Sequence, residues 1–138
     1  MRTVQDILNK KGDSVYWIEP LASVFDALQL MSDRNCGALC VMIDDYLVGI
    51  VSERDYVRHV IFDRNASKQT KVSEIMTRDV VHVGPADSAE HCIALMRDHK
   101  FRHLPVVVEG RVVGMLSLRD LFVEMIDEAQ QAAHGSAD

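Results

Sequence analysis

The sequence predicts an α+β fold made of two β-α-β-β-α units, and three observations support this prediction. The strings GIVSERD at 49–55 and GMLSLRD at 114–120 are nearly the same and lie 65 residues apart. This spacing holds without a gap when 20–61 is paired with 85–126, where 13 of 42 positions are identical. Each half also alternates short β-rich runs with amphipathic stretches. Two copies favour a closed pair with a shared core, because a solenoid usually needs three or more repeats.

Each predicted unit opens with a short strand followed by an amphipathic helix. The β-rich runs lie at 15–18 and 80–83, each just before a proline. Apolar residues of the two helices keep the i, i+3, i+4, i+7 spacing of one buried face, namely Val24, Ala27, Leu28 and Met31, then Ala89, Cys92, Ile93 and Met96. Asp87, with Glu90 three residues on, predicts a capping box at the start of the second helix.

A hairpin of two apolar strands and a second helix complete each unit. In the first unit ALCVMI and LVGIV flank the turn DDY, and in the second LPVVV and VVGML flank the turn EGR. These strands are apolar enough to be buried on both faces. The final helices are expected over 52–61 and 117–126, and short helical leads over 3–9 and 72–76 precede the units.

The predicted boundaries are a first repeat at 2–62, a polar linker at 63–71, a second repeat at 72–127 and a frayed tail at 128–138. The 138 residues are 48% hydrophobic and 26% charged, as in globular proteins. The net charge of −6 argues against general binding to nucleic acid or anionic membranes, which needs a basic face. Since the chain has no apolar run of membrane-spanning length and no apolar signal-peptide core, a cytoplasmic protein is expected.

Metal and catalytic chemistry have weaker support in the sequence. Cys36, Cys40 and Cys92 lie in apolar contexts, which predicts buried reduced thiols. A metal site built from these cysteines and nearby histidines is an alternative, but no second compact pair completes a tetrahedral set. The chain also lacks the phosphate-binding motif G-x-x-x-x-G-K-[ST], G-x-G-x-x-G after a strand, and the nucleophile turn G-x-S-x-G. We therefore predict no catalytic residue, no metal and no enzyme activity.

Several motifs together resemble a known family. The paired G-h-h-S-x-R-D strings, IMT at 75–77, the P-x-x-S openings and RHLPV at 102–106 look like a tandem pair of CBS domains, named after cystathionine β-synthase. The resemblance covers 2–127. It implies a Bateman-module-like pair packed through its sheets about a pseudo-twofold axis, with two clefts for AMP, ADP, ATP, NAD(H) or S-adenosylmethionine. It also implies a homodimer and a regulatory sensor in signal transduction.

The repeated Ser-x-Arg-Asp strings are the predicted ligand sites. Ser52 and Ser117 stand where a strand ends and a helix begins, so free N–H groups and the helix dipole favour an anion there. Asp55 and Asp120 follow three residues later, and an ionised carboxylate, which only accepts hydrogen bonds, suits the two hydroxyls of a ribose. The alternative is a helix-capping box with no ligand. A serine can serve both purposes.

The second site is expected to bind phosphate more strongly than the first. By the resemblance, Arg102 and His103 before Pro105 contact the phosphate, whereas the first unit has Gly37 and Ala38 at the positions that match the basic pair. The alternative for His103 is a packed or capping histidine.

Other cations extend this prediction. Arg54 and Arg119 offer forked donors to phosphate. In place of a basic pair such as Arg102 and His103, the first site is expected to recruit Lys11, Arg54, Arg58 or Lys68, although each is alternatively a solvated surface charge. The full set of candidate ligand-binding residues is Ser117, Arg119, Asp120, Arg102, His103, Pro105, Thr77, Val80, Ser52, Arg54, Asp55, Gly37, Ala38 and Lys11.

The predicted function is an adenine-nucleotide sensor that changes conformation when its ligand binds and acts on an unidentified regulated protein. The alternative is a structural or interaction module whose clefts are vestigial. In either case a homodimer is expected through helix faces that carry Val24, Phe25, Phe122 and Met125.

Overall fold

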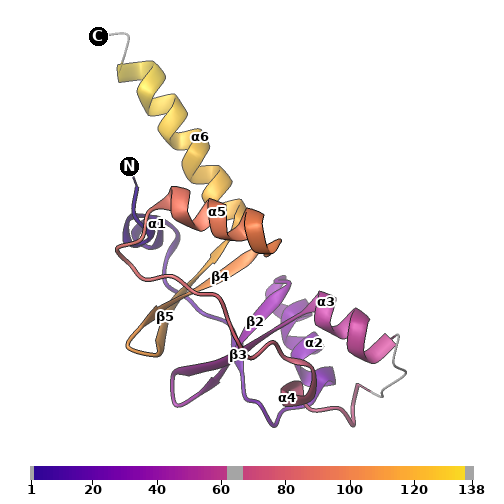
Figure 1. Cartoon of the computed structure of the whole chain (residues 1–138). Coiled ribbons are helices and arrows are strands. Elements are labelled where there is room, and N and C mark those ends of the chain that lie inside the picture. Colours follow the sequence, from indigo (N-terminus) through magenta and orange to yellow (C-terminus); the bar gives the residue numbers. More distant parts are fainter. Residues whose placement is uncertain (1, 62–66, 136–138) are drawn as a thin grey trace. The chain divides into compact units, whose positions relative to one another are not determined.

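A computed structural model describes residues 2–61 and 67–135, and it has the predicted α+β composition (Figure 1). Along the chain the elements are α1 Val4–Lys11, β1 Trp17–Ile18, α2 Val24–Arg34, β2 Ala38–Ile43, β3 Tyr46–Ser52, α3 Glu53–Tyr56, the π-helix η1 Val57–Ile61, α4 Val72–Ile75, α5 Ala89–His99, β4 His103–Val108, β5 Arg111–Ser117 and α6 Leu118–Gly135. The strand order is β1-β2-β3-β5-β4. The first repeat has the predicted order of elements, and the second lacks only its opening strand.

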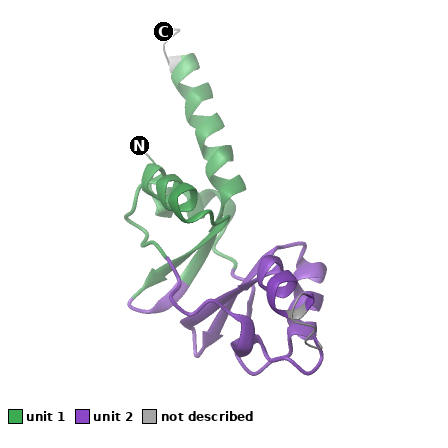
Figure 2. Cartoon of the chain, turned by 45° about the vertical axis from the view of Figure 1, so that its right-hand side comes forward, with its two compact units in different colours: residues 1–14, 82–108, 113–138 green, residues 15–81, 109–112 purple. Residues whose placement is uncertain are grey.

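The chain divides into two compact units that do not follow the repeats (Figure 2). Unit 1 holds the described parts of 1–14, 82–108 and 113–138, and unit 2 holds those of 15–81 and 109–112. Helix α1 precedes the first repeat but belongs to unit 1, together with α5 and α6 of the second repeat. Helix α4 precedes the second repeat but belongs to unit 2. The two helical leads are therefore exchanged, and the repeat boundaries and the pseudo-twofold packing stay predictions.

Unit 2 is built on β1, β2 and β3. Strand β1 pairs with β2 in parallel, and β2 pairs with β3 antiparallel. Asp44 and Asp45 form the turn between β2 and β3 with φ of 50° and 70°, a left-handed conformation that Asp tolerates better than most residues. The core joins the predicted stripe of α2 to the sheet and to α4, and consists of Ile18, Val24, Ala27, Met31, Leu39, Val41, Val51, Val72 and Ile75.

Unit 1 packs α1, α5 and α6 with β4 and most of β5. Its buried apolar residues come from all five elements and include Val4, Ile7, Leu8, Ala89, Cys92, Met96, Leu104, Val106, Leu116 and Leu121. Of the four residues in the predicted stripe of α5, Ala89, Cys92 and Met96 are buried and Ile93 is half-buried. Helix α1 thus supplies three side chains to the core of the unit that contains the second repeat.

The cysteines are free thiols. Cys40 and Cys92 are buried as predicted, whereas Cys36 is half-buried. Burial raises the pKa of Cys40 to about 12 and that of Cys92 to about 11. These two thiols therefore stay uncharged at neutral pH and serve as small apolar core residues.

The strand predicted at 80–83 does not form. Only Val83 pairs, as an isolated bridge with Val106. Val83 N–H donates to Pro105 O (3.0 Å) and Val107 N–H donates to Val83 O (2.8 Å). Because Pro105 has no N–H, the ladder cannot extend along β4 at that residue.

The predicted cap of α5 is also wrong. The N-cap is Ser88, whose Oγ accepts from His91 N–H at 3.1 Å. The Asp87 carboxylate instead accepts from Gly84 N–H at 2.7 Å, across the preceding turn. Sequence spacing alone did not distinguish these two neighbouring cap residues.

Helix α6 is longer than the sequence pattern indicated. It continues to Gly135, so the described part of the tail expected to fray is helical. The segment EAQQAA is composed of good helix formers, which accounts for the extension. Residues 136–138 of the predicted tail and 62–66, which include the start of the predicted linker, lie outside the described residues.

Two glycines lie where the exchanged leads approach the strands. A Cβ on Gly49 in β3 would lie 2.6 Å from Met76 Sδ and 3.0 Å from Thr77 O. A Cβ on Gly114 in β5 would lie 2.8 Å from Leu8 Cδ2. A Cβ at either position would force the Met76 or Leu8 side chain to shift, and at Gly49 it would also press against the backbone oxygen of Thr77.

We expect Gly49→Ala to lower the free energy of unfolding by about 1 to 3 kcal/mol, as overpacked cores do. The midpoint of urea denaturation measures this. Gly84→Ala is the matched control, because the nearest atoms to its Cβ would lie at 3.9 Å. Equal midpoints for Gly49→Ala and the wild type would contradict the close packing of β3 against Met76 and Thr77.

Candidate functional site

The first candidate site is the turn from β3 into α3. Asp55 Oδ2 accepts hydrogen bonds from Ser52 N–H (2.8 Å) and from the Ser52 hydroxyl (3.0 Å). Asp55 N–H donates to Ser52 Oγ at 3.3 Å, which closes a capping box. The helix-capping box, which was the alternative to a ligand site, is therefore present. The carboxylate also lies at the start of the helix, as the sequence predicted.

The turn from β5 into α6 repeats this geometry. Ser117 N–H donates to Asp120 Oδ2 (2.7 Å), and Asp120 N–H donates to Ser117 Oγ (3.1 Å). Both aspartates are partly exposed. Each turn thus offers solvent a carboxylate whose orientation is fixed by its own backbone.

Lys11 distinguishes the two turns. It is the last residue of α1, and its Nζ lies 2.7 Å from Asp120 Oδ2 and donates to Met115 O at 2.6 Å. Lys11 was expected at the first site, and this expectation is wrong. The reason is the exchange of the leads, which brings α1 to the second repeat.

The charge state of Asp120 follows from these contacts. Partial burial raises the pKa of Asp120, but the hydrogen bonds from Lys11 and Ser117 outweigh it and hold the pKa below its ordinary value of 3.8. The carboxylate is therefore ionised at neutral pH and acts only as an acceptor.

Backbone hydrogen bonds bring the predicted phosphate residues to the same turns. Glu53 N–H donates to Gly37 O (3.1 Å), and Leu118 N–H donates to Arg102 O (2.8 Å). Gly37 and Ala38 thus adjoin the first turn, and Arg102 and His103 adjoin the second. Arg102 is exposed, whereas His103 is half-buried and Pro105 is buried within β4.

The remaining candidates belong to unit 2. Thr77 pairs with Ile50 of β3 through two backbone hydrogen bonds, of 2.9 and 3.0 Å, two residues before Ser52. Val80 is half-buried, and its N–H donates to Arg78 O. The structure therefore groups Thr77 and Val80 in one unit with Ser52 and Asp55.

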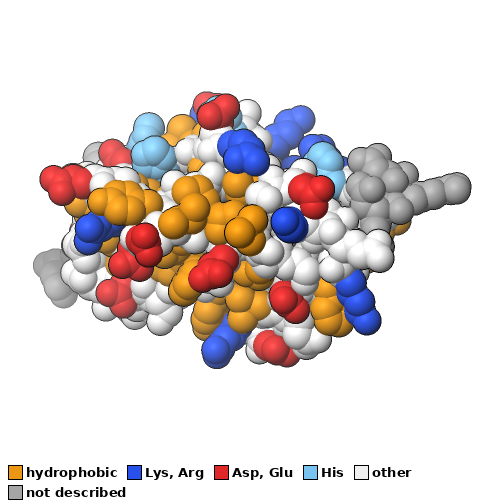
Figure 3. Space-filling view, turned by 90° about the horizontal axis from the view of Figure 1, so that it is seen from below, with side chains coloured by type: hydrophobic (Ala, Val, Ile, Leu, Met, Phe, Trp, Pro, Cys, Tyr) orange, Lys and Arg blue, Asp and Glu red, His pale blue; other side chains and the backbone are white. Residues whose placement is uncertain are grey.

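Exposed arginines follow both serines. Arg54 and Arg119 are exposed and form no ion pair with any residue that the structure describes. On the face shown in Figure 3, side chains of both charge signs lie among exposed apolar ones. Arg54 supplies positive charge next to the first turn. Next to the second turn it is supplied by Arg102, Arg119 and Lys11, and Lys11 already pairs with Asp120.

Metal binding and membrane spanning have no structural counterpart in the described ranges. Within 2–61 and 67–135, no group of three or more His, Cys, Asp and Glu side chains could hold a metal ion. No helix in the same ranges is long and apolar enough to cross a membrane.

Sequence reasoning missed the acidic side of α6. Asp120, Glu124 and Glu128 recur every four residues, and cations of the N-terminal segment lie against them. The sequence does contain a sign of this acidic side, because no lysine or arginine lies three or four residues from Glu124 within α6 to pair with it. It indicated a cationic partner from another segment without identifying which one.

Comparison with known proteins identifies the family of the repeats. The model of the CBS domain matches residues 4–61 and 72–127. The chain is 33% identical to "CBS domain-containing protein CBSX3, mitochondrial" of Arabidopsis thaliana, over 94% of this chain and 67% of that protein. The family match thus spans both repeats.

Solved structures agree with this family. The crystal structure of the CBS domain NE2398 superposes with a TM-score of 0.86 at 45% identity, covering 91% of this chain and 98% of that one. The CBS domain pair of protein MJ0100 has the same fold, with a TM-score of 0.81 at 22% identity and coverage of 93% and 98%. The chain therefore belongs to the CBS domain family, as a regulatory protein with a tandem pair of CBS domains.

Proposed function

We propose that this protein is a non-catalytic sensor that binds an adenosine-containing ligand at the Ser52–Asp55 and Ser117–Asp120 turns. The observation that carries the proposal is the repeated, partly exposed carboxylate at each strand-to-helix turn, preceded in the chain by an exposed arginine that forms no ion pair with any described residue. The crystal structure of the related MJ0100 pair is a complex with 5′-methylthioadenosine and S-adenosyl-L-methionine. The ligands we propose for this chain are AMP, ADP, ATP or NAD(H).

Each residue type has a role in this proposal. Asp55 and Asp120 accept hydrogen bonds from the ribose hydroxyls. Arg102 and Arg119 donate to phosphate at the second turn, and Arg54 does so at the first. His103, next to Arg102, adds a ring donor at the second turn. The second site consequently binds phosphorylated ligands more tightly than the first.

A panel of ligands tests the proposal by thermal denaturation. AMP, ADP, ATP, NAD, NADH and S-adenosylmethionine are each added in excess, and a ligand at 100 times its dissociation constant stabilises the folded protein by about 2.7 kcal/mol. We expect at least one adenine nucleotide to raise the melting temperature. If none does at millimolar concentration, the sites are vestigial and the alternative of a structural module holds.

We expect Arg102→Ala to weaken AMP binding by about tenfold and to leave adenosine binding nearly unchanged, because the arginine contacts only the phosphate. Calorimetry with both ligands measures the two affinities. Arg97→Ala is the control, since Arg97 is an exposed cation of the same unit whose partner is Asp98. Equal losses for AMP and adenosine would show that Arg102 acts on the fold of the site.

The second candidate function is dimerisation, which exposed apolar helix residues favour. Phe25 of α2 is 41% exposed, and Phe122 and Met125 of α6 are 51% and 48% exposed. Val24 was also expected at this interface, and that prediction is wrong, because Val24 is buried in the core with only 1% of its surface exposed. The proposed homodimer therefore uses Phe25, Phe122 and Met125 without Val24.

We expect light scattering to give the mass of a dimer at micromolar concentration. Phe122→Glu should shift the mass toward a monomer, because it places a charge in an apolar interface. Gln130→Glu adds the same charge to an exposed polar position of α6 and should leave the dimer intact. A wild-type monomer at these concentrations would contradict the homodimer.

A further inference from the structure

The oxygen of Asp120 that faces the turn has no acceptor capacity left. Oδ2 accepts from Ser117 N–H and from Lys11 Nζ, both at 2.7 Å. A carboxylate has about four lone-pair sites, two on each oxygen. A ribose diol that engages both oxygens therefore has to take the place of one of these donors. Ser117 N–H is held by the backbone, so the donor that can leave is Lys11.

Among the residues that the structure describes, no cation pairs with Asp55 as Lys11 pairs with Asp120. Asp55 Oδ2 accepts from Ser52 N–H and from the Ser52 hydroxyl. The hydroxyl can rotate away from Asp55 without moving any other segment. The position that matches Lys11 at the 65-residue spacing is Met76, which carries no charge.

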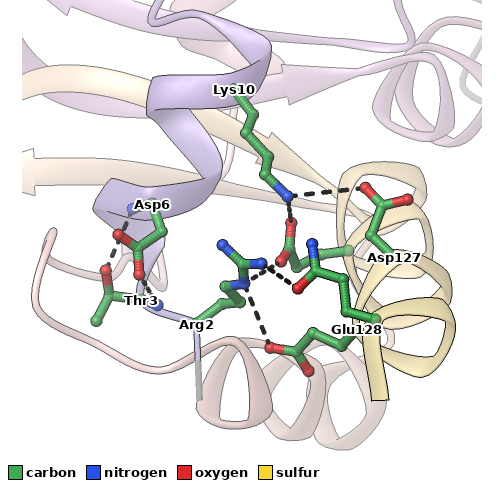
Figure 4. A network of polar contacts seen from close by, with 8 residues as sticks. Arg2, Thr3, Asp6, Lys10, Asp127 and Glu128 are labelled. Atoms are coloured by element: carbon green, nitrogen blue, oxygen red, sulfur yellow. Dashed lines mark hydrogen bonds and ion pairs between the residues drawn. The ribbon is translucent and has the colours of Figure 1, made fainter. Parts of the chain in front are cut away.

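Lys11 joins three elements of unit 1. From the end of α1 it donates to Met115 O in β5 (2.6 Å) and to Asp120 in α6. Other cations of the N-terminal segment lie against α6 further from the turn, where Arg2 Nε is 2.9 Å and Lys10 Nζ 3.3 Å from Glu124 (Figure 4). Of these three cations, Lys11 alone pairs with the carboxylate that we assign to the ligand.

We infer that Lys11 is a positioning residue that couples the second ligand site to α1. In the ligand-free protein it holds the C-terminal end of α1 against β5 and α6. A ligand whose diol takes Asp120 displaces the ammonium and frees that end of the helix. This inference rests on the proposed ligand role of Asp120, and it gives Lys11 a role different from a phosphate contact.

The direction in which ligand affinity changes when Lys11 is removed distinguishes this coupling from a direct ligand contact. Lys11 and the diol compete for one oxygen, so the free energy of the Lys11 pair is subtracted from the affinity of the ligand. Removal of Lys11 therefore strengthens binding of a ligand that uses only Asp120. Removal of a cation that touches the ligand would weaken binding.

The first test is calorimetry with adenosine, which has the diol and no phosphate, on the full-length protein. We expect Lys11→Met to bind adenosine about two- to fivefold more tightly than the wild type, the range for a partly exposed ion pair. Lys10→Met is the matched control, because Lys10 has the same charge on the same helix but pairs with Glu124 and Asp127. It should bind adenosine as the wild type does.

The second test is hydrogen exchange of α1 in the wild type, with and without adenosine. Adenosine should speed amide exchange at the C-terminal end of α1, where Gly12 N–H donates to Leu8 O at 2.8 Å. In Lys11→Met exchange there should already be fast and should not rise further. Slower exchange in the wild type with adenosine would overturn the release of α1.

The outcomes separate the inference from the proposed function. If the wild type binds adenosine and Lys11→Met binds it equally or more weakly, the coupling is refuted while the ligand site stands. If neither protein binds adenosine or any nucleotide, both are refuted. Binding only by Lys11→Met would support the coupling in its strongest form.

Discussion

Asp120→Ala is expected to weaken nucleotide binding by about 10- to 100-fold. A hydrogen bond to a charged group contributes about 1.5 to 3 kcal/mol net, and each 1.4 kcal/mol is about tenfold in affinity. Calorimetry with AMP measures the loss. Asp55→Ala should have the smaller effect on the tightest site, because the first turn lacks counterparts of Arg102 and His103.

Controls separate ligand contact from folding. Asp127→Ala removes the same charge from the same helix, but Asp127 lies next to Lys10 rather than at the turn, so AMP affinity should not change. Asp120→Asn keeps an oxygen that accepts from Ser117 N–H, so it replaces the alanine variant in the binding measurement if that variant does not fold. It too should lose affinity, since the amide carries no charge.

The pattern of losses decides which turn binds the ligand. Equal losses from Asp55→Ala and Asp120→Ala would mean equivalent sites. A loss confined to Asp55→Ala would place the main site at the first turn and contradict our assignment.

The double variant Arg2→Met/Lys10→Met is expected to lower the free energy of unfolding by about 2 to 3 kcal/mol. Glu124 is 3% exposed, and among the described residues its ion pairs are with Arg2 and Lys10. Removing one side of a buried ion pair costs about 3 to 5 kcal/mol, and we take a lower value because Arg2 and Lys10 are themselves partly exposed. The melting temperature should fall by roughly 10 °C.

The geometry at Glu124 explains why loss of the neighbouring cations should destabilise the buried carboxylate. Arg2 Nε lies 2.9 Å from Oε1, near enough for an ion pair, yet the two are not aligned as a hydrogen bond, and Oε1 has no hydrogen-bond partner among the described residues. Oε2 accepts one hydrogen bond, from Lys10 Nζ at 3.3 Å, so at Oε1 the burial of the carboxylate is offset by the attraction of Arg2 without a directed hydrogen bond.

A third substitution tests this account. Adding Glu124→Gln to the double variant removes the buried charge and should restore most of the lost stability. If the triple variant is as unstable as the double one, lost packing of the Arg2 and Lys10 side chains is the cause. Arg97→Met is a control for removing an exposed cation and should change stability by less than about 0.5 kcal/mol.

Local patterns predicted most of the fold. The 65-residue repeat and the i, i+3, i+4, i+7 stripes located the helices and hairpins, because amphipathic spacing reports burial directly. The failures have local causes that spacing does not report. Pro105 in the neighbouring strand stopped the ladder at Val83, and Ser88 formed the cap in place of Asp87.

The candidate sites were predicted only in part. The Ser-x-Arg-Asp repeat located both turns and their carboxylates, since all the groups involved lie within four residues. The contact between Lys11 and Asp120 could not be predicted, because it joins residues 109 positions apart. Nothing in the amphipathic pattern of α1 specifies which of two similar repeats will bury it.

The exchanged leads also set an order of events during synthesis. Helix α1 is synthesised before the other elements of unit 1. Leu104, Leu116 and Leu121, which share its core, follow roughly 95 to 115 residues later. At a synthesis rate of about 5 to 20 residues per second, the apolar face of α1 stays without its native contacts for several seconds or more. Most of unit 2 is complete by Val81, so we expect it to fold while α1 is still unpacked. Helix α1 is thus synthesised before α2 but buried after it.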